Sequence, residues 1–519
     1  MIPLMHLLAP VRRRTTLRVG VALALVAVLA QGCAGAWWAV GGASAGLGLV
    51  ASRMNPLYGG QHRDRSPIFT PDPRSPGVRM SYLELDDRGW FWDRSKPREL
   101  IDSLASLAAH GNVAVVVYVH GWRHNLGRRD RDVESFSRTI GILGSNVVQG
   151  KVFRDLRRRA SGDPNTTLVG IQIGWRGKMW PECPPLSKGH GFFANATNLP
   201  MFVANVPIYF TFWSRKAAAE RIGHGDLSEF LGDLDALYRR MHDDPHRLMT
   251  MVVVGHSFGG QAVFDATRER IESHFASAIA QGLGPKGPTP GHAFYPPAAG
   301  ASPIRVRERV RGFGDLVVLI NPAIEAETYH RIDQFVRSLQ FGEVDFPQQP
   351  ILLVVSAKND VARGKFFRIG RWFSTFGART QGHTDQKKLL RSALGAYEPQ
   401  VTDDLELRDD SPATIEAARR TIRDPLPDRA PAPVQQVVDS NYVAQKLDIT
   451  HPSPDRPLIV RTPRKGEDRP LPARVMVASP HVIDGHSDFF RVEFIHWLAN
   501  EVLAIQSARL NERGVKNRS

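Results

Sequence analysis

One segment of the chain combines a serine with the glycines that a catalytic turn needs. An apolar run at Leu248–Val254 leads into Gly255-His256-Ser257-Phe258-Gly259, and a helical pattern follows at Gly259–Ser273. A Gly-x-Ser-x-Gly turn between a strand and a helix holds its serine in a strained conformation, with the hydroxyl above the sheet edge. Ser257 is therefore a candidate nucleophile for covalent catalysis.

A second match to the same pattern lies near the N-terminus. Residues 42–46 read Gly-Ala-Ser-Ala-Gly, but no apolar strand pattern precedes them and they adjoin an apolar, membrane-type segment. Because the motif acts only between a strand and a helix, Ser44 is expected to have no catalytic role.

In the nucleophile motif and its flanking pattern, the chain resembles the α/β-hydrolase superfamily, on its serine esterase and lipase side. The likeness covers roughly residues 78–500. It implies an α/β fold of the α/β-hydrolase type, a mostly parallel sheet flanked by helices. It also implies a serine, an acid and a histidine in that chain order, with two backbone amides forming an oxyanion hole.

The loop Val119-His120-Gly121-Trp122 follows a predicted strand upstream of the nucleophile. By resemblance, the oxyanion donors would be the backbone N–H groups of Trp122 and Phe258, and one such donor is typically worth about 3 kcal/mol of barrier. The better-known His-Gly-Gly-Gly form of this loop is absent. His120 and His124 could also be considered as metal ligands, but without nearby carboxylates the pattern is weak.

The resemblance places the catalytic histidine after the last strand, which favours His486 in Asp484-Gly-His486-Ser-Asp488. A neutral imidazole there would accept the serine proton and later return it to the leaving group. His383 is the rival, at a more ordinary distance past the acid, but no strand pattern leads into it.

For the acid, Asp360 comes directly after a predicted strand, in Ser356-Ala-Lys-Asn-Asp360. A carboxylate there would hold the histidine in the correct tautomer and stabilise the imidazolium. Glu325, after the preceding strand, is the rival. The order Ser257, Asp360, His486 matches the family's order.

The elements that must position these residues are short apolar runs alternating with helical patterns. Such runs suit strands buried on both faces of a parallel sheet, and the alternation predicts an α/β fold. The predicted strands are Val78–Leu85, Val113–Val119, Leu168–Ile173, Leu248–Val254, Leu316–Ile320, Ile351–Val355 and Arg474–Val477. The predicted helices include Asp226–Met241, Gly259–Ser273 and Val492–Ala504.

The pattern predicts one hydrolase domain at residues 78–505, after a proline-rich, membrane-proximal linker at 34–77 and before a basic C-terminal tail at 506–519. Two stretches are interpreted as insertions into the domain. Residues about 177–225 are aromatic and glycine-rich, which fits a mobile apolar lid or ordinary packing equally well. Residues about 397–472 are polar and proline-rich.

The first 33 residues resemble a bacterial lipoprotein signal. Four arginines precede an uncharged run from Val19 to Ala30, which is shorter than the roughly 20 apolar residues that span a bilayer. The run ends at Ala30-Gln-Gly-Cys33, and by resemblance Cys33 would carry the lipid. An uncleaved anchor and simple secretion are the alternatives. All three predict a protein of the bacterial cell envelope, associated with the membrane or on its periplasmic side.

The distribution of charge is compatible with a lipid partner and does not favour a nucleic-acid partner. Lys and Arg number 67 against 52 Asp and Glu, giving a net charge of +15. The basic clusters are interleaved with acids and scattered, which favours a solvated basic surface with some attraction to anionic lipid. The two cysteines, Cys33 and Cys183, are too few for a disulfide scaffold or a Cys-rich zinc module.

Together these features predict a serine hydrolase that cleaves carboxylic esters, lipid-like ones included, through an acyl-enzyme intermediate. No metal or organic cofactor is expected. The expected partners are a small-molecule or lipid-like ester and, through the N-terminus, the membrane. Two alternatives stay open: an acyltransferase that uses the same triad, and a catalytically silent envelope lipoprotein.

We expect Cys33→Ser to leave an unprocessed precursor, since no other cysteine lies near the end of the apolar run. Mass spectrometry of the membrane-extracted protein checks this, with a lipid-modified N-terminus at Cys33 as the result for the unaltered chain. An intact Met1, or a soluble form that begins elsewhere, would contradict the lipoprotein interpretation.

Overall fold

The computed structural model describes residues 66–71, 77–127, 130–148, 151–177, 214–242, 244, 247–283, 303–306, 309–341, 348–360, 384–409, 411–419 and 458–516. Every described residue belongs to the second of the two units into which the chain divides, at His62–Ser519. The predicted signal with Cys33, and also Ser44, His383 and the aromatic residues 191–213, lie outside the described residues.

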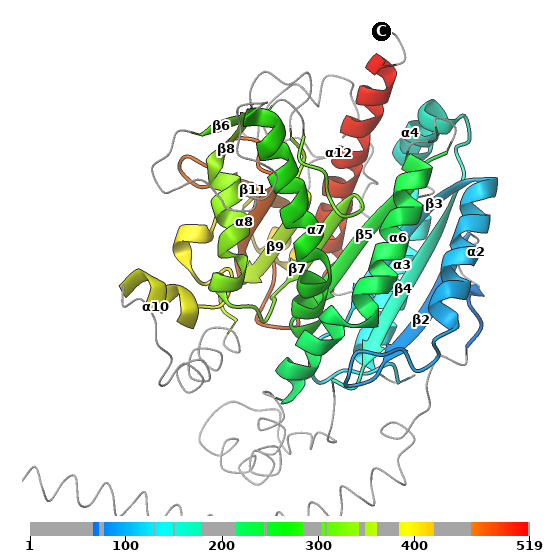
Figure 1. The fold of residues 1–519 in the computed structure, drawn as a ribbon, viewed down its shortest axis with the longest axis horizontal. Coiled ribbons are helices and arrows are strands. Elements are labelled where there is room, and N and C mark those ends of the chain that lie inside the picture. The colour runs from blue at the N-terminus through cyan, green and yellow to red at the C-terminus, as the bar shows by residue number, and fades with distance from the viewer. Residues whose placement is uncertain are drawn as a thin grey trace, which may run out of the picture. The chain divides into compact units, whose positions relative to one another are not determined.

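A ten-stranded, mostly parallel sheet forms the centre of the second unit (Figure 1). The strand order is β1-β2-β4-β3-β5-β7-β9-β12-β10-β11. Neighbours from β2 to β10 pair in parallel, and β1 and β11 add antiparallel edges. The strands are β1 (Thr70–Pro71), β2 (Val78–Leu85), β3 (Asn112–Val119), β4 (Thr166–Trp175), β5 (Met249–His256), β7 (Leu316–Ile320), β9 (Leu352–Ala357), β10 (Asp403–Leu407), β11 (Ile459–Pro463) and β12 (Ala473–Ala478). The short strands β6 (Ile304–Val306) and β8 (Leu339–Phe341) pair separately.

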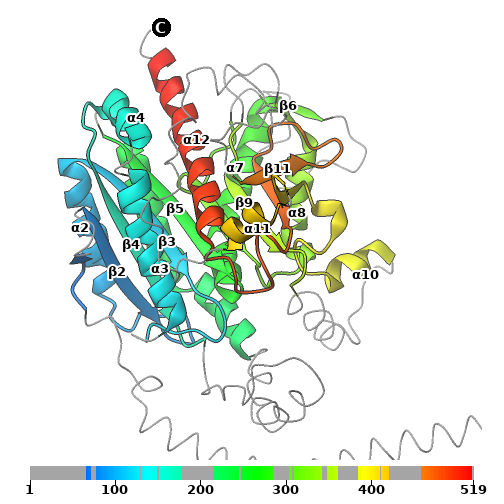
Figure 2. The same ribbon diagram turned by 180° about the vertical axis from the view of Figure 1, so that it is seen from behind.

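Helices cover both faces of this sheet, which makes the fold α/β (Figures 1 and 2). One face carries α2 (Lys96–His110), α6 (Asp226–His242), α7 (Phe258–Leu283) and α8 (Ala326–Ser338). The other carries α3 (Arg131–Ile142), α4 (Lys151–Ser161), α11 (Pro412–Arg419) and α12 (Val492–Lys516), with a π-helical turn at Leu143–Val148 after α3. Residues 214–224 are helical, and α10 (Thr384–Arg391) and the 3₁₀ turn at Glu398–Gln400 complete the elements.

The alternation of side chains along each strand feeds two separate cores. On β3, for example, Val115 and Val117 face the core under α2 and α7, whereas Ala114 and Tyr118 face the core under α3 and α12. Successive strand residues point to opposite faces, so a strand buried on both sides must be apolar throughout. This is why the apolar runs identify the strands, and all of the predicted strands are confirmed to within two residues at either end.

The predicted insertion at residues 397–472 is corrected by the structure. Its described parts contain β10, which pairs in parallel with β12, and β11, which pairs with β10. Because this stretch is polar, it has no apolar run that would predict these strands. Asp403 on β10 is fully buried, where it accepts hydrogen bonds from Arg474 on β12 at 2.9 Å and from Arg461 on β11 at 2.8 Å. A buried ion pair thus stands where the pattern requires an apolar side chain.

The predicted tail at residues 506–519 is also corrected, because α12 continues to Lys516. Gln506 is buried and donates to Asp315 at 2.5 Å, and Arg509 forms an ion pair with the same carboxylate. Asp315 directly precedes β7, so these contacts hold α12 to the sheet beyond Ala504, where the predicted helix ends.

The other predicted boundaries change less. Thr70 and Pro71 of the predicted linker at 34–77 form β1 against β2. Within the predicted insertion at 177–225, residues 214–224 form a helix that buries Ala218 and Ile222. In the described part of the chain, no helix is long and apolar enough to cross a membrane.

The sheet order decides where side chains can meet. Strands β3, β5, β7, β9 and β12 are adjacent and parallel, so their carboxyl ends share one edge. In open α/β sheets this edge is the usual place for a ligand or a reaction. The loops that follow these five strands carry every described site residue predicted from the sequence.

Candidate active site

Ser257 lies between the last residue of β5 and the first residue of α7, and its backbone is strained. Its φ of 56° is in the left-handed region, which residues other than glycine seldom adopt. Three hydrogen bonds hold it there. The N–H group of Ser257 donates to the Ile320 carbonyl at 3.0 Å, and its carbonyl accepts from the N–H groups of Gln261 at 3.2 Å and Ala323 at 3.1 Å. The strand, the helix and the loop after β7 therefore determine this conformation together.

The glycines on either side of Ser257 allow the close backbone contacts of the turn. A Cβ atom on Gly255 would lie 2.6 Å from the carbonyl oxygen of Gly259, and one on Gly259 would lie 2.2 Å from that of Val119. These distances are well inside van der Waals contact, and the atoms they approach are backbone atoms that cannot move aside. A side chain at either position would push α7 away from the strands.

His486 bridges the serine and the aspartate. Its Nε2 atom is 2.7 Å from the Ser257 hydroxyl, and its Nδ1 atom is 2.7 Å from Oδ2 of Asp360. The Asp360 side chain is fully buried, whereas that of His486 is partly exposed. With the Nδ1 proton donated to Asp360, Nε2 can accept the serine proton. The arrangement can therefore activate the hydroxyl as a nucleophile and store its proton on the imidazole.

Two side chains that the sequence did not single out hold the backbone of His486. Its carbonyl accepts hydrogen bonds from Nε2 of His256 at 2.9 Å and from Nδ2 of Asn321 at 2.8 Å. Asn321 also donates to the Gly485 carbonyl at 3.2 Å and accepts from the N–H group of Ala357 at 2.7 Å. The amide thus connects the ends of β7 and β9 to the histidine loop.

A signal for Asn321 did exist in the sequence. It follows the strand Leu316–Ile320 directly and precedes Pro322, at the edge where site residues gather. Its φ is 44°, and asparagine is among the few residues that tolerate this conformation. What the sequence could not indicate is the loop that its amide reaches.

Asn359 provides a second connection to the histidine loop, next to the acid. Its Nδ2 donates to Asp484 at 2.6 Å, and its Oδ1 accepts from the N–H group of Gly485 at 2.9 Å. The loop after β9 therefore positions Asp360 and the backbone before His486 at the same time. This coupling fixes the imidazole relative to the carboxylate.

His256 is a buried neutral donor. Burial lowers the pKa of His256 well below its ordinary value of 6.5, and the neighbouring His486 lowers it further. Its ring lies 4.5 Å from that of Phe489 and 5.1 Å from that of His486, measured between centroids. The contact with the His486 carbonyl assigns the proton of the neutral ring to Nε2.

The predicted oxyanion loop passes directly against the nucleophile. A Cβ atom on Gly121 would lie 2.7 Å from the Cβ atom of Ser257, so only glycine fits there. Trp122 follows, with its ring 6.4 Å from that of Phe258, and Arg123 turns the chain away with a φ of 72°. Phe258 begins α7, and the first N–H groups of a helix have no acceptor within it. Of the two residues predicted as donors, Phe258 thus follows Ser257 directly, and Trp122 follows Gly121, which lies against Ser257.

His120 shapes this loop. It is fully buried, and burial lowers its pKa. Its Nε2 accepts from the N–H group of Trp175 at 3.2 Å, so the proton on Nδ1 donates to the Gly121 carbonyl at 2.9 Å. The indole N–H of Trp175 in turn donates to the His120 carbonyl at 2.9 Å. His120 therefore acts as a structural link between β3 and β4.

The metal alternative for His120 and His124 receives no support from their contacts. His124 pairs with Asp130 at 2.9 Å, whereas the ring nitrogens of His120 bond to backbone groups. Within the described ranges, no group of three or more His, Cys, Asp or Glu side chains could hold a metal ion.

Glu325, the rival acid, lies at the N-terminus of α8 and is engaged elsewhere. Its carboxylate forms an ion pair with the buried Lys216 at 3.2 Å. The Lys216 ammonium also donates to Gln261 at 3.2 Å and to Glu220 at 3.1 Å. The carboxylate that contacts His486 is that of Asp360.

Comparisons with known proteins provide no assignment. No model of a known protein family matches the chain, and no curated protein matches it. Among solved structures, a similar chain is described as "Crystal structure of an uncharacterized protein from Pseudomonas aeruginosa", with 10% sequence identity and a TM-score of 0.17. The likeness covers 53% of this chain and 40% of the other, so this chain spans less than half the length of that protein. At that score the likeness carries no argument about function.

We expect Asp360→Asn to lower the rate at which p-nitrophenyl acetate acylates Ser257 by about 10⁴, because the amide favours the wrong imidazole tautomer. Glu325→Gln should lower the rate by less than about tenfold, since that carboxylate serves Lys216. Stopped-flow absorbance measures both rates, and circular dichroism checks the fold of each variant. If Glu325→Gln lowered the rate more than Asp360→Asn, the acid would be Glu325, in the loop after β7.

The same measurement tests the base. If His383→Ala abolished the acylation and His486→Ala did not, the base would be His383.

The stability of the unaltered protein should fall more steeply below pH 6.5 than that of His256→Gln. In the folded chain His256 stays neutral, whereas in the unfolded chain it binds a proton near 6.5. The unfolded state then holds the extra proton, so acid favours unfolding by up to about 1.4 kcal/mol per pH unit from this group. Urea unfolding of both proteins between pH 5 and about 8 gives the difference. If the free energy of unfolding of the two proteins fell equally with falling pH, His256 would be protonated in the folded state as it is in the unfolded state.

Proposed function

We propose that the chain is a serine hydrolase of the α/β-hydrolase type that cleaves carboxylic esters through an acyl-enzyme intermediate. The observation that carries the proposal is His486, whose ring nitrogens lie 2.7 Å from the Ser257 hydroxyl and 2.7 Å from the buried Asp360. The strained turn at Ser257 and the close approach of Gly121 to its Cβ atom also support the proposal, because a turn of this kind between a strand and a helix is typical of serine nucleophiles.

In the proposed first step, Oγ of Ser257 attacks the ester carbonyl while its proton passes to Nε2 of His486. The buried carboxylate of Asp360 stabilises the imidazolium that forms. The N–H groups of Trp122 and Phe258 would donate to the oxyanion of the tetrahedral intermediate. Return of the proton from His486 to the leaving alkoxide then releases the alcohol and leaves the acyl group on Ser257.

In the proposed second step, a water molecule gives a proton to Nε2 of His486 and its oxygen attacks the acyl carbonyl. Collapse of the second tetrahedral intermediate returns the proton to Oγ of Ser257 and frees the carboxylic acid. Protein side chains and backbone amides fill every role in this cycle. The proposal therefore needs neither a metal nor an organic cofactor.

The location is part of the proposal. The lipoprotein-type signal that ends at Cys33 would attach the hydrolase to the cell envelope, on the periplasmic side of the membrane. An ester substrate that is itself lipid-like would then lie within reach of the enzyme.

The test is labelling with a fluorophosphonate, which modifies activated serines. We expect the label on Ser257, and we expect p-nitrophenyl acetate to give a burst of p-nitrophenol equal to the enzyme concentration where deacylation is slow. Ser257→Ala should lose the label and lower turnover by several orders of magnitude with the fold intact. Ser44→Ala is the matched control, since Ser44 lies in the other Gly-x-Ser-x-Gly pentapeptide. Label on Ser44, or none on the folded protein, would overturn the proposal.

A further inference from the structure

Two tryptophans are exposed next to each other on the surface of the described unit. Trp90 is 48% exposed and Trp92 is 57% exposed, and no other large apolar side chain is exposed in the part of the chain that the structure describes. Both lie in the loop that joins β2 to α2. Because water disfavours apolar surface, large aromatic side chains are mostly buried. A pair of exposed indole rings therefore indicates a surface that another apolar phase covers.

The loop holds both indole rings outward in a fixed conformation. Phe91, between them, is buried and packs edge to face on Phe230, with ring centroids 5.9 Å apart. Its N–H group donates to Asp226 at 2.9 Å, and that of Trp92 donates to the Glu84 carbonyl at 3.0 Å. Docking of the rings would therefore need no reordering of the loop, which lowers the entropic cost of binding.

The turn before Trp90 is also fixed. The carboxylate of Asp86 accepts hydrogen bonds from the N–H groups of Arg88 at 2.8 Å and Trp90 at 2.9 Å. Gly89 has a φ of 90°, and a Cβ atom on it would lie 2.6 Å from the carbonyl oxygen of Arg221. Only glycine fits there, so the turn packs directly on the helix that contains Arg221.

The tryptophan loop lies at the edge of the sheet that carries the candidate active site. It follows the carboxyl end of β2, and Ser257 follows that of β5. Strands β4 and β3 lie between these two, so three strand spacings separate the loop from Ser257, about 14 Å at about 4.8 Å each. In Figure 1 this edge of the sheet is the lower one. A layer that contacts the tryptophans would therefore face the same edge as Ser257.

The exposed charge around the tryptophans is mostly positive. In the described parts of the loops after β2, β4 and β3, the exposed charged side chains are four arginines and one aspartate: Arg88, Arg94, Arg176, Arg123 and Asp93. The guanidinium of Arg94 lies over the ring of Trp90, 4.8 Å from its centroid. Indole rings favour the headgroup level of a bilayer, and arginine binds phosphate groups. This combination fits an anionic lipid surface.

The N-terminal end of the described residues lies at the same edge. β1 runs antiparallel to β2, with Thr70 opposite Met80, so the residues before Thr70 come from the carboxyl end of β2. Ser66 accepts a hydrogen bond at 3.2 Å from Lys96, which begins α2 directly after the tryptophan loop. The chain that the sequence predicts to lead from the membrane therefore joins the described residues beside the tryptophans.

We propose that Trp90 and Trp92, with the arginines around them, form a membrane-docking surface that places both indole rings among the headgroups of anionic lipids. This binding needs no turnover and does not depend on the proposed function. One consequence does rest on the proposed function: docking brings an ester within the lipid layer to the edge that carries Ser257.

The first test measures contact between the loop and lipid in the full chain. Trp92→Cys, with Cys33→Ser and Cys183→Ser, is labelled with nitrobenzoxadiazole and mixed with vesicles of phosphatidylcholine and phosphatidylglycerol. Lipids with a nitroxide near the headgroup should quench the dye by at least about half, because the loop lies at headgroup level. Arg158→Cys is the matched control, since Arg158 is exposed on α4, which precedes β4 at the opposite edge. Its dye should not be quenched.

Substitutions in the protein labelled at position 92 test the two parts of the surface. Trp90→Ala should reduce the quenching at least about twofold, since one of the two apolar groups is lost. Arg88→Gln with Arg94→Gln should do the same, as should vesicles of phosphatidylcholine alone, because the attraction to anionic lipid is lost. Arg158→Gln removes an arginine from the opposite edge and should leave the quenching unchanged.

Three results would overturn the docking surface. The first is equal quenching of the dyes at positions 92 and 158, and the second is no quenching at 92. The third is a blue shift of the dye at 92 that depends on protein concentration without vesicles, because a second copy of the chain would then cover the tryptophans.

The second test compares p-nitrophenyl palmitate dissolved in the same vesicles with p-nitrophenyl acetate in water. Trp90→Ala with Trp92→Ala should lower the rate on the palmitate at least about fivefold and leave the rate on the acetate within about twofold. Quenching at position 92 without hydrolysis of either ester would remove the proposed function and keep the docking surface. Hydrolysis of both esters that the double substitution leaves unchanged would keep the hydrolase and remove the surface as its route to the substrate.

Discussion

A parallel sheet brings the carboxyl ends of all its strands to one edge, and the candidate site depends on this constraint. Ser257 follows β5, Asp360 follows β9 and His486 follows β12, while Gly121 follows β3 and Asn321 follows β7. These five strands are neighbours in the order β3-β5-β7-β9-β12. Segments separated by more than 200 residues of sequence, such as those of Ser257 and His486, thereby come within hydrogen-bond distance.

At that edge, hydrogen bonds to backbone groups help to position Ser257 and His486, in addition to the contacts among Ser257, His486 and Asp360. The Ser257 amide bonds to the end of β7, and the His486 carbonyl accepts from His256 and Asn321. Ser257, His256 and Asn321 are buried, so a polar group of theirs left without its hydrogen bond would cost free energy. Because the loops share their partners, a shift of one loop would leave several buried groups unsatisfied. The cost of that loss holds the geometry of the site in place, as the proposed electrostatic catalysis would require.

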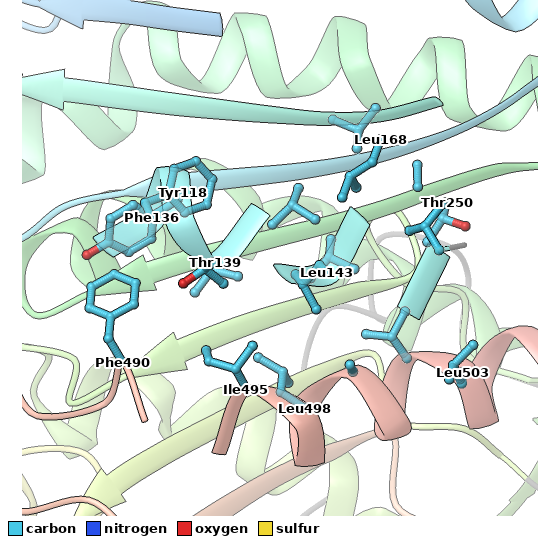
Figure 3. Close-up of a pocket in the computed structure, with 18 of the residues that line it drawn as sticks. Tyr118, Phe136, Thr139, Leu143, Leu168, Thr250, Phe490, Ile495, Leu498 and Leu503 are labelled. Carbon is cyan, nitrogen blue, oxygen red and sulfur yellow. The ribbon is translucent and has the colours of Figure 1, made fainter. Parts of the chain in front are cut away.

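The two faces of the sheet are closed to different degrees. On one face, α2, α6, α7 and α8 cover a continuous core. On the other, an apolar cavity of about 110 Å³ lies between the sheet and the helices α3 and α12 (Figure 3). The far part of α12 is fastened by Gln506 and Arg509 to Asp315, so the helix is held to the sheet beyond the cavity as well.

The amino-acid sequence by itself determined the parts of the fold that depend on local pattern. Strands buried on both faces must be apolar, so their positions could be predicted to within two residues. The turn at Ser257 needs glycine at 255 and 259 because a Cβ atom at either position would collide with backbone atoms. A serine between two such glycines, directly after an apolar strand pattern, therefore predicts the turn. These are requirements on neighbouring residues, which a sequence records directly.

Only the tertiary structure decided the features that rest on long-range partners. Asp403 belongs to a buried strand because Arg474 and Arg461 neutralise it, and its polar surroundings in the sequence indicated an insertion. Glu325 and Asp360 both follow strands, and Lys216 occupies the first while the second contacts His486. Asn321 acts through a loop 164 residues away, and the cavity exists between helices that are far apart in the chain. In each case the stabilising contact joins residues that are far apart in the chain. The sequence around one residue therefore does not reveal its partner.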